Sequence, residues 1–142
     1  MTNRPEPPVN PVSPAEVRAL LAGGRLAEAA ALAGRLPATP EGLALRARLL
    51  ARTGDLAAGL ALLTPGPAQP LPPGNWARHR AFLLLETGKP AEAGREFETA
   101  LAAEPAARDL QLGLVDALEL AGDPAAALAR LETLLAADPA AP

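Results

Sequence analysis

Short amphipathic stretches separated by glycine and proline make up most of this 142-residue chain. Within each stretch, Leu and Ala recur every three or four positions, which is the period of an α-helix with one buried face. In residues 90–103, for example, Ala93, Phe97 and Leu101 share one face, whereas the charged residues occupy another. β-branched residues are rare, so the pattern predicts an all-α fold and disfavours a sheet.

Capping residues and helix breakers divide the chain into eight predicted helices. Ser13, Thr39, Asp55, Asn75 and Asp123 stand where N-caps are expected, because their side chains can accept a hydrogen bond from a free backbone N–H. Glycine or proline follows most of the stretches and ends them. The predicted ranges are about 14–22, 26–36, 40–53, 56–64, 76–87, 90–103, 107–121 and 124–137.

A spacing of 34 residues relates successive pairs of these helices. Gly54, Gly88 and Gly122 recur at this spacing, and Leu131 follows Phe97 by the same number of residues. A constant period of this size is typical of stacked helical repeats. We expect Gly88 and Gly122 to end helices with positive φ, a conformation that glycine adopts at little cost.

The stretch with Ala93, Phe97 and Pro105 resembles a tetratricopeptide repeat, a helix–turn–helix unit of 34 residues. The resemblance implies a right-handed α-solenoid of about four helical hairpins. We expect this solenoid to cover residues 13–138, with repeats at about 13–37, 40–64, 74–107 and 108–141. The first of these is degenerate, since its turn precedes Gly54 by 30 residues.

Two proline-rich segments lie outside the predicted helices. Residues 1–12 contain four prolines and few apolar groups, so we expect a disordered arm. Residues 65–74 contain five prolines and two glycines and cannot be helical. This connector is either a hinge between half-domains or an extended substitute for a missing helical turn, and the preserved 34-residue step favours the second. Trp76 either stacks on Arg80 or packs over the connector, which we favour.

Composition narrows the classes of function. The chain has no cysteine and one histidine, so the sequence offers no thiolate zinc site, multi-histidine metal site or cysteine nucleophile. We expect no enzyme activity and no cofactor. The net charge of −3, without lysine clusters or interleaved aromatic residues, disfavours nucleic acid. The sequence shows neither a signal peptide nor an apolar run of membrane-spanning length, so we expect a cytoplasmic protein that does not bind membranes.

The resemblance also implies that the first helix of each hairpin lines a concave groove. The matching positions are Arg18, Glu41, Arg48, Arg52, Asn75, Arg78, His79, Phe82, Glu86, Asp109, Asp116 and Glu119. Residues 1–80 carry a net charge of +4 and residues 81–142 carry −7, so the groove would run from cationic to anionic. Because guanidinium groups pair well with carboxylates, we expect a protein-interaction module that binds an acidic peptide or helix. Alternatively, these charges only solvate the outer faces of alanine-rich helices.

A self-associating structural subunit is the alternative function. The last predicted helix carries Leu128, Leu131 and Leu135 along one stripe, and we expect Leu128 and Leu135 to face outward. Many proteins of the resembled family cover this position with a further helix, whereas this sequence ends at Pro142. We therefore expect a homodimer that buries these leucines.

Overall fold

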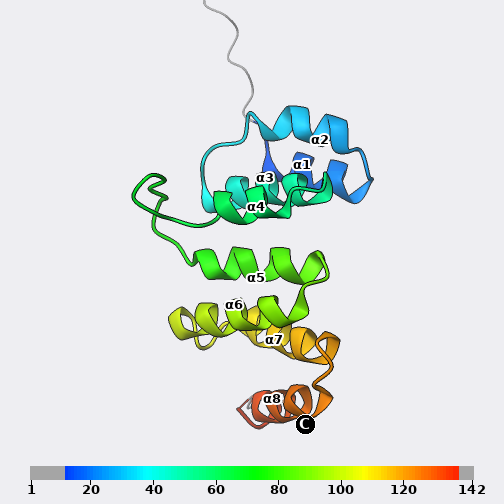
Figure 1. Cartoon of the computed structure of the whole chain (residues 1–142), viewed down its shortest axis with the longest axis vertical. Helices are drawn as coiled ribbons and strands as arrows, with labels where there is room; N and C mark the ends of the chain where they lie inside the picture. Colours follow the sequence, from blue (N-terminus) through cyan, green and yellow to red (C-terminus); the bar gives the residue numbers. More distant parts are fainter. Residues whose placement is uncertain (1–11, 138–142) are drawn as a thin grey trace, which may run out of the picture.

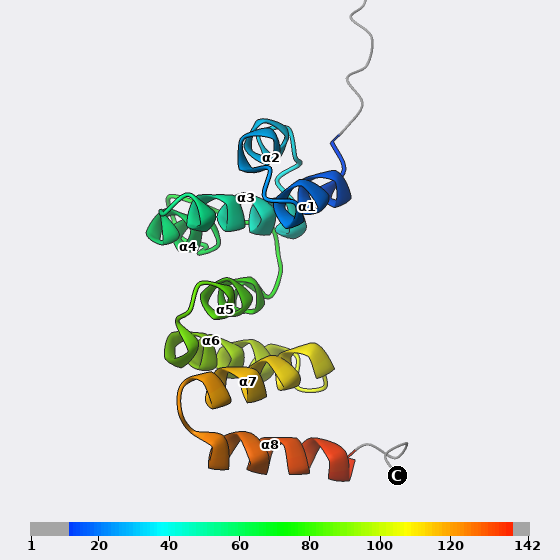
Figure 2. The same cartoon turned by 90° about the vertical axis from the view of Figure 1, so that its right-hand side faces the viewer.

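In the computed structural model, which describes residues 12–137, eight α-helices form four hairpins stacked in chain order (Figures 1 and 2). The helices are α1 (Pro14–Ala22), α2 (Leu26–Ala33), α3 (Pro40–Arg52), α4 (Leu56–Leu62), α5 (Trp76–Glu86), α6 (Pro90–Ala103), α7 (Arg108–Leu120) and α8 (Pro124–Ala137). No β-strand occurs among the described residues, which confirms the all-α prediction. The largest errors in the predicted boundaries lie at the ends of α2 and α4, which stop two or three residues early. The predicted arm lies outside the described residues, apart from Val12, which is buried.

A glycine with positive φ follows the first helix of every hairpin. Gly88 and Gly122 have φ values of 78° and 89°, as predicted from the 34-residue spacing. Gly24 and Gly54 occupy the same conformation in the first two hairpins, at 73° and 96°. Since side chains with a Cβ atom rarely adopt this conformation, the four glycines set the geometry of the four hairpin turns.

Four of the five predicted N-caps are confirmed. The side chains of Ser13, Thr39, Asp55 and Asp123 each accept a hydrogen bond from a backbone N–H in the first turn of the following helix. The prediction for Asn75 is wrong, because its side chain makes no hydrogen bond to the start of α5. The side-chain N–H groups of Asn75 instead donate to the carbonyl oxygen of Ala100 and to Oε2 of Glu104 at the end of α6.

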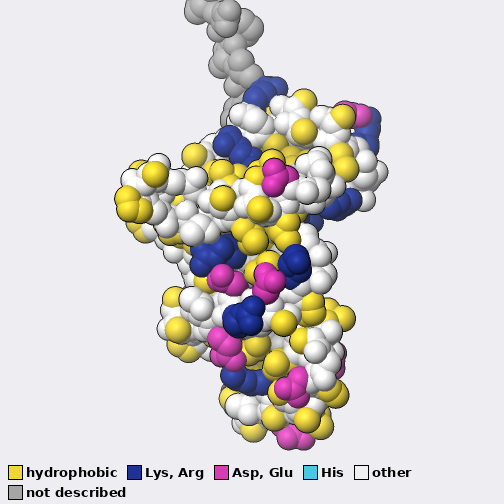
Figure 3. All heavy atoms as spheres, viewed as in Figure 1, with side chains coloured by type: hydrophobic (Ala, Val, Ile, Leu, Met, Phe, Trp, Pro, Cys, Tyr) yellow, Lys and Arg dark blue, Asp and Glu magenta, His cyan; other side chains and the backbone are white. Residues whose placement is uncertain are grey.

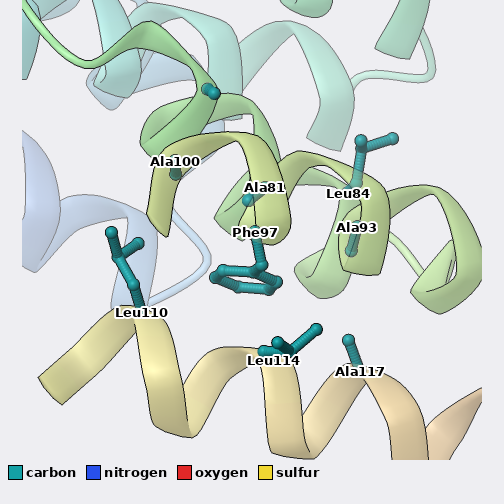
Figure 4. Close-up of a cluster of buried hydrophobic side chains, with 9 residues drawn as sticks. Ala81, Leu84, Ala93, Phe97, Ala100, Leu110, Leu114 and Ala117 are labelled. Carbon is teal, nitrogen blue, oxygen red and sulfur yellow. The ribbon is translucent and has the colours of Figure 1, made fainter. Parts of the chain in front are cut away.

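Phe97 is the largest side chain that the structure buries fully. Its ring points from α6 toward Leu110 and Leu114 on α7 (Figure 4). It also meets the ring of Phe82 on α5 edge to face, with 5.0 Å between the centroids. Gly113 leaves the room for this ring, since a Cβ atom at that position would lie 2.5 Å from Cε1 and Cζ of Phe97. The contact therefore joins the last two hairpins through one aromatic ring and one missing side chain.

The proline-rich connector 65–74 is attached to the end of α4. The side-chain amide of Gln69 donates hydrogen bonds to the carbonyl oxygens of Ala61 (2.7 Å) and Thr64 (3.1 Å). These are carbonyls that the missing last turns of α4 would otherwise have bonded. The connector is not extended throughout, because the backbone groups of Gly66 and Gln69 pair at 3.0 Å and close a tight turn.

The connector is also attached to the start of α5. Trp76 is buried, and its indole N–H donates to the carbonyl oxygen of Pro72 at 3.0 Å. Arg80 points elsewhere, since its guanidinium donates to the carbonyl oxygen of Leu63 and to Glu96. Trp76 therefore packs over the connector, as favoured from the sequence, and the second and third hairpins are joined by hydrogen bonds as well as by apolar packing.

We expect Gly113→Ala to lower the free energy of unfolding by about 1–3 kcal/mol, the usual cost of overpacking a core. The added methyl group would overlap the Phe97 ring. The ring cannot move away easily, because it packs against Phe82 on α5 and against α7 itself. Urea unfolding followed by circular dichroism measures the change.

Gly94→Ala is the matched control for this substitution, because Gly94 also lies inside a helix. The nearest side-chain atom to a Cβ at Gly94 is Cδ1 of Leu114, at 4.0 Å. Alanine also favours helix over glycine by up to about 1 kcal/mol, so we expect unchanged or increased stability. Equal destabilisation by the two substitutions would contradict the role assigned to the Phe97–Gly113 contact.

Candidate partner-binding groove

The first helices of the hairpins form one row, since α3 contacts α1 and α5, and α5 contacts α7. A hollow of about 210 Å³ lies between α1, α3 and α5. It is lined by Arg18, Glu41, Ala44, Leu45, Arg48, His79, Phe82, Leu83 and Glu86. The structure therefore brings together six of the predicted groove residues, Arg18, Glu41, Arg48, His79, Phe82 and Glu86.

A second hollow of about 310 Å³ continues the first along α3 and α5. It is lined by Arg48, Ala51, Arg52, Leu83, Glu86 and Thr87, and so shares Arg48, Leu83 and Glu86 with its neighbour. We call the two together the α3–α5 groove. Its floor contains the apolar side chains of Ala44, Leu45 and Leu83 together with the Phe82 ring, and its rims are charged.

Most arginines of the groove are paired with acids on a neighbouring helix. Nε of Arg48 lies 3.0 Å from Oε2 of Glu86, and Arg18 forms an ion pair with Glu41. These pairs neutralise the end of the groove that the sequence predicted to be cationic. Arg52 is exposed and makes no ion pair or side-chain hydrogen bond to any residue in 12–137. The guanidinium of Arg52 is therefore the one most available to a ligand.

Arg78 and Asn75 join α5 to the α6–α7 connection and do not line the α3–α5 groove. Nη2 of Arg78 donates to Oδ1 of Asp109 at 3.0 Å, and Nε donates to Oε2 of Glu104 at 3.2 Å. The amide of Asn75 donates to the same Glu104 oxygen and to the carbonyl oxygen of Ala100. The hydrogen bond from Arg78 lowers the pKa of Asp109, and that from Asn75, assisted by Arg78, lowers the pKa of Glu104. The bond to Asp109 in turn raises the pKa of Arg78.

His79 lies half-buried in the wall of the groove. Its ring centroid is 5.7 Å from that of Trp76. Burial lowers the pKa of His79 below its ordinary value of 6.5, and the positive charge of Arg78 lowers it further. The imidazole is therefore neutral near pH 7 and presents an uncharged face to the groove.

The remaining predicted groove residues, Asp116 and Glu119, lie on the exposed face of α7. Neither side chain pairs with a base among the described residues. Sequence reasoning missed the two leucines beside them, Leu112 and Leu120, which are 43% and 67% exposed. The 34-residue spacing could have found them, because they match Arg78 and Glu86 on α5.

The predicted self-association residues lie on α8. Leu128 and Leu135 are 57% and 51% exposed, as expected from their position on the outer stripe. Leu131 is half-buried. Together with Leu112 and Leu120, Leu128 and Leu135 are the exposed large apolar side chains of the described chain, and all four lie on the last hairpin.

Charged side chains of both signs also gather across the middle of the face shown in Figure 3. A hollow of about 410 Å³ between α4, α5 and α6, which we call the α4–α6 hollow, is lined by Leu60, Thr64, Arg80, Leu84, Glu92, Arg95 and Glu96. Nη2 of Arg80 lies 3.2 Å from Oε2 of Glu96, so part of this charge is internally paired. Within residues 12–137, no cluster of three or more His, Asp or Glu side chains could hold a metal ion. No helix there is both long and apolar enough to cross a membrane.

We expect the NMR titration of His79, the single histidine, to report a pKa below 6.5. As the pH falls through about 6.5, the unfolded chain takes up a proton that the folded chain excludes, so the free energy of unfolding should decrease. His79→Gln should remove this decrease. A further decrease near pH 4 should remain, because the lowered pKa values of Asp109 and Glu104 stabilise the fold only above their ordinary values of 3.8 and 4.5. A His79 pKa above 6.5 would contradict the burial of the ring.

Comparison with known proteins gives one match. A family model described as Tetratricopeptide repeat matches residues 84–142, which begin within α5 and include α6, α7 and α8. No curated protein and no solved structure matches the chain. The matched stretch is also where the 34-residue spacing is best preserved. Residues 84–142 are therefore similar to the tetratricopeptide repeat family, in agreement with the resemblance seen in the sequence.

Proposed function

We propose that this protein is a non-catalytic interaction module that binds a peptide or helix of a partner protein in the α3–α5 groove. Tetratricopeptide repeats generally mediate protein–protein interaction. The observation that carries the proposal is the continuous pair of hollows, with an apolar floor and the unpaired Arg52 at one end. A groove of this kind suits a chain that presents an apolar side chain and a carboxylate together.

The apolar floor supplies most of the affinity in this proposal. Fully burying one large apolar side chain stabilises a complex by roughly 1.5–3 kcal/mol before the costs of association. An exposed ion pair contributes only about 0–1 kcal/mol. Arg52 would therefore affect the choice and orientation of an acidic partner more than its affinity. Arg48 would contribute in the same way when a ligand carboxylate displaces Glu86.

Replacing both groove arginines with acids tests this function. We expect Arg48→Glu with Arg52→Glu to weaken partner binding by about 1–2 kcal/mol, or roughly 5- to 30-fold, because two attractive contacts become repulsive. The partner is first identified by a pull-down from native cell extract, and its Kd is then measured by calorimetry at low and high salt. Binding to the wild type should weaken as salt rises.

Arg95→Glu is the control for the charge change. Arg95 is an exposed arginine on α6 that lines the α4–α6 hollow, outside the groove, and it forms no ion pair with the described residues. We expect this variant to bind the partner as the wild type does. An unchanged Kd for the double variant, or an equal loss for Arg95→Glu, would rule out the α3–α5 groove as the site.

Self-association through α8 is the second candidate, favoured by the exposure of Leu128 and Leu135. These residues match Gly94 and Leu101 on α6, which face α7. The face of α8 that carries them is thus equivalent to one that is covered in the preceding hairpin. A two-fold contact would let one such face cover another.

We expect sedimentation at micromolar concentration to give a dimer for the wild type and a monomer for Leu128→Glu with Leu135→Glu. Burying a leucine stabilises the dimer by roughly 1.5–3 kcal/mol, whereas a buried and unpaired carboxylate destabilises it. A monomeric wild type would refute self-association, and a dimer that survives the double substitution would place the contact elsewhere.

A further inference from the structure

Four exposed residues form one stripe on α7. The stripe begins at Leu112 and continues with Asp116, Glu119 and Leu120, which follow it by four, seven and eight residues. At this helical spacing all four lie on one face of α7. The opposite side of α7, with Leu110, is buried against α6. The stripe therefore presents an exposed leucine at each end and two acids between the ends or beside them. We call these four residues the α7 stripe.

The α7 stripe occupies the next row of the surface that includes the α3–α5 groove. By the 34-residue spacing, Leu112 matches Arg78 and Leu120 matches Glu86 on α5. Helices α5 and α7 contact each other, and the Arg78–Asp109 pair joins their exposed sides. A ligand that extends beyond the groove toward the C-terminal hairpin would therefore reach the α7 stripe.

The chemistry of the α7 stripe differs from that of the matching positions on α5. On α5, Arg78 and Glu86 are both held in ion pairs. On α7 those two positions are leucines, and the acids between them, Asp116 and Glu119, have no basic partner among the described residues. The stripe thus combines exposed apolar surface with uncompensated negative charge, which is complementary to apolar side chains flanked by Lys or Arg.

We infer that the α7 stripe binds a basic amphipathic segment of a partner protein. Apolar side chains of that segment cover Leu112 and Leu120, and its Lys or Arg side chains pair with Asp116 and Glu119. The inference rests on the proposed function and deepens it, because the two ends of the surface then select opposite charges. Arg52 receives the acidic end of the partner and α7 receives the basic end, so the partner binds in one orientation.

A second copy of this chain is a poorer occupant of the same stripe. A two-fold contact would bring the Asp116 and Glu119 side chains of both copies together in a partly desolvated interface. Residues 81–142 carry a net charge of −7, which adds repulsion between two such halves. A basic segment would not bring acidic side chains together and would not be repelled by the negative charge of residues 81–142.

Three synthetic peptides of about 18 residues, or five helical turns, provide the probes. The first places Leu at helical spacing with Lys on both flanks, the second replaces Lys with Glu, and the third scrambles the Leu–Lys order. Fluorescence anisotropy on the full chain measures each Kd. We expect the ordered Leu–Lys peptide to bind at least about tenfold more tightly than the other two.

Matched pairs of substitutions assign the binding to the stripe. We expect Leu112→Gln with Leu120→Gln to weaken the Leu–Lys peptide at least about tenfold, and Asp116→Asn with Glu119→Gln to do the same while reducing the salt dependence. Glu92→Gln with Glu132→Gln removes two exposed acids that lie on α6 and α8, away from the stripe, and it should leave Kd within about twofold.

Two results would overturn the inference. Equal weakening by Glu92→Gln with Glu132→Gln would show general attraction of the peptide to the acidic half of the chain. A wild-type dimer that Leu112→Gln with Leu120→Gln dissociates would make the stripe a self-association surface. The native partner separates this inference from the proposed function. If the Arg48 and Arg52 variant loses that partner while both α7 variants keep it, the proposed function stands and the inference fails.

Discussion

The close approach of the third and fourth hairpins is the constraint on which much of this structure depends. A helical hairpin of Leu and Ala cannot bury its apolar face alone, so each hairpin is stable only against its neighbour. Between α6 and α7 the contact is a Phe97 ring seated where Gly113 has no side chain. The glycine costs some helical stability but allows packing at the density of a protein interior. The row formed by α5 and α7 depends on this contact.

The stacking of the first helices determines which charged side chains form ion pairs. Arg48 and Glu86 are 38 residues apart in sequence, and Arg78 and Asp109 are 31 apart, yet both pairs form ion pairs between adjacent first helices. A spacing near the repeat length puts two residues at the same height on neighbouring helices. The repeat therefore acts on electrostatics as well as on packing, because it places opposite charges side by side and neutralises much of the groove.

Features that depend on neighbouring residues could be predicted from the sequence, and features that depend on distant ones could not. The turn glycines, four N-caps and the helix ranges follow from local backbone chemistry, and they agree with the structure within about a turn. Asn75 was misassigned because Glu104, its hydrogen-bond partner, lies 29 residues away. The first half of the groove was expected to be cationic because the sequence shows how many arginines it has but not that Glu41 and Glu86 lie beside them. Leu112 and Leu120 were overlooked because leucine on a helix is usually assigned to the core.

Internal pairing also bears on selectivity in the proposed function. A ligand carboxylate that reaches Arg48 must displace Glu86, so the number of ion pairs does not change and little free energy is gained. At Arg52, or at Asp116 and Glu119, a ligand gains a pair without breaking one. In the proposed function, the unpaired groups on α3 and α7 would therefore select the partner more strongly than the paired groups between them. The apolar floor, which is indifferent to direction, would contribute affinity, and the unpaired charges would determine which way the partner lies.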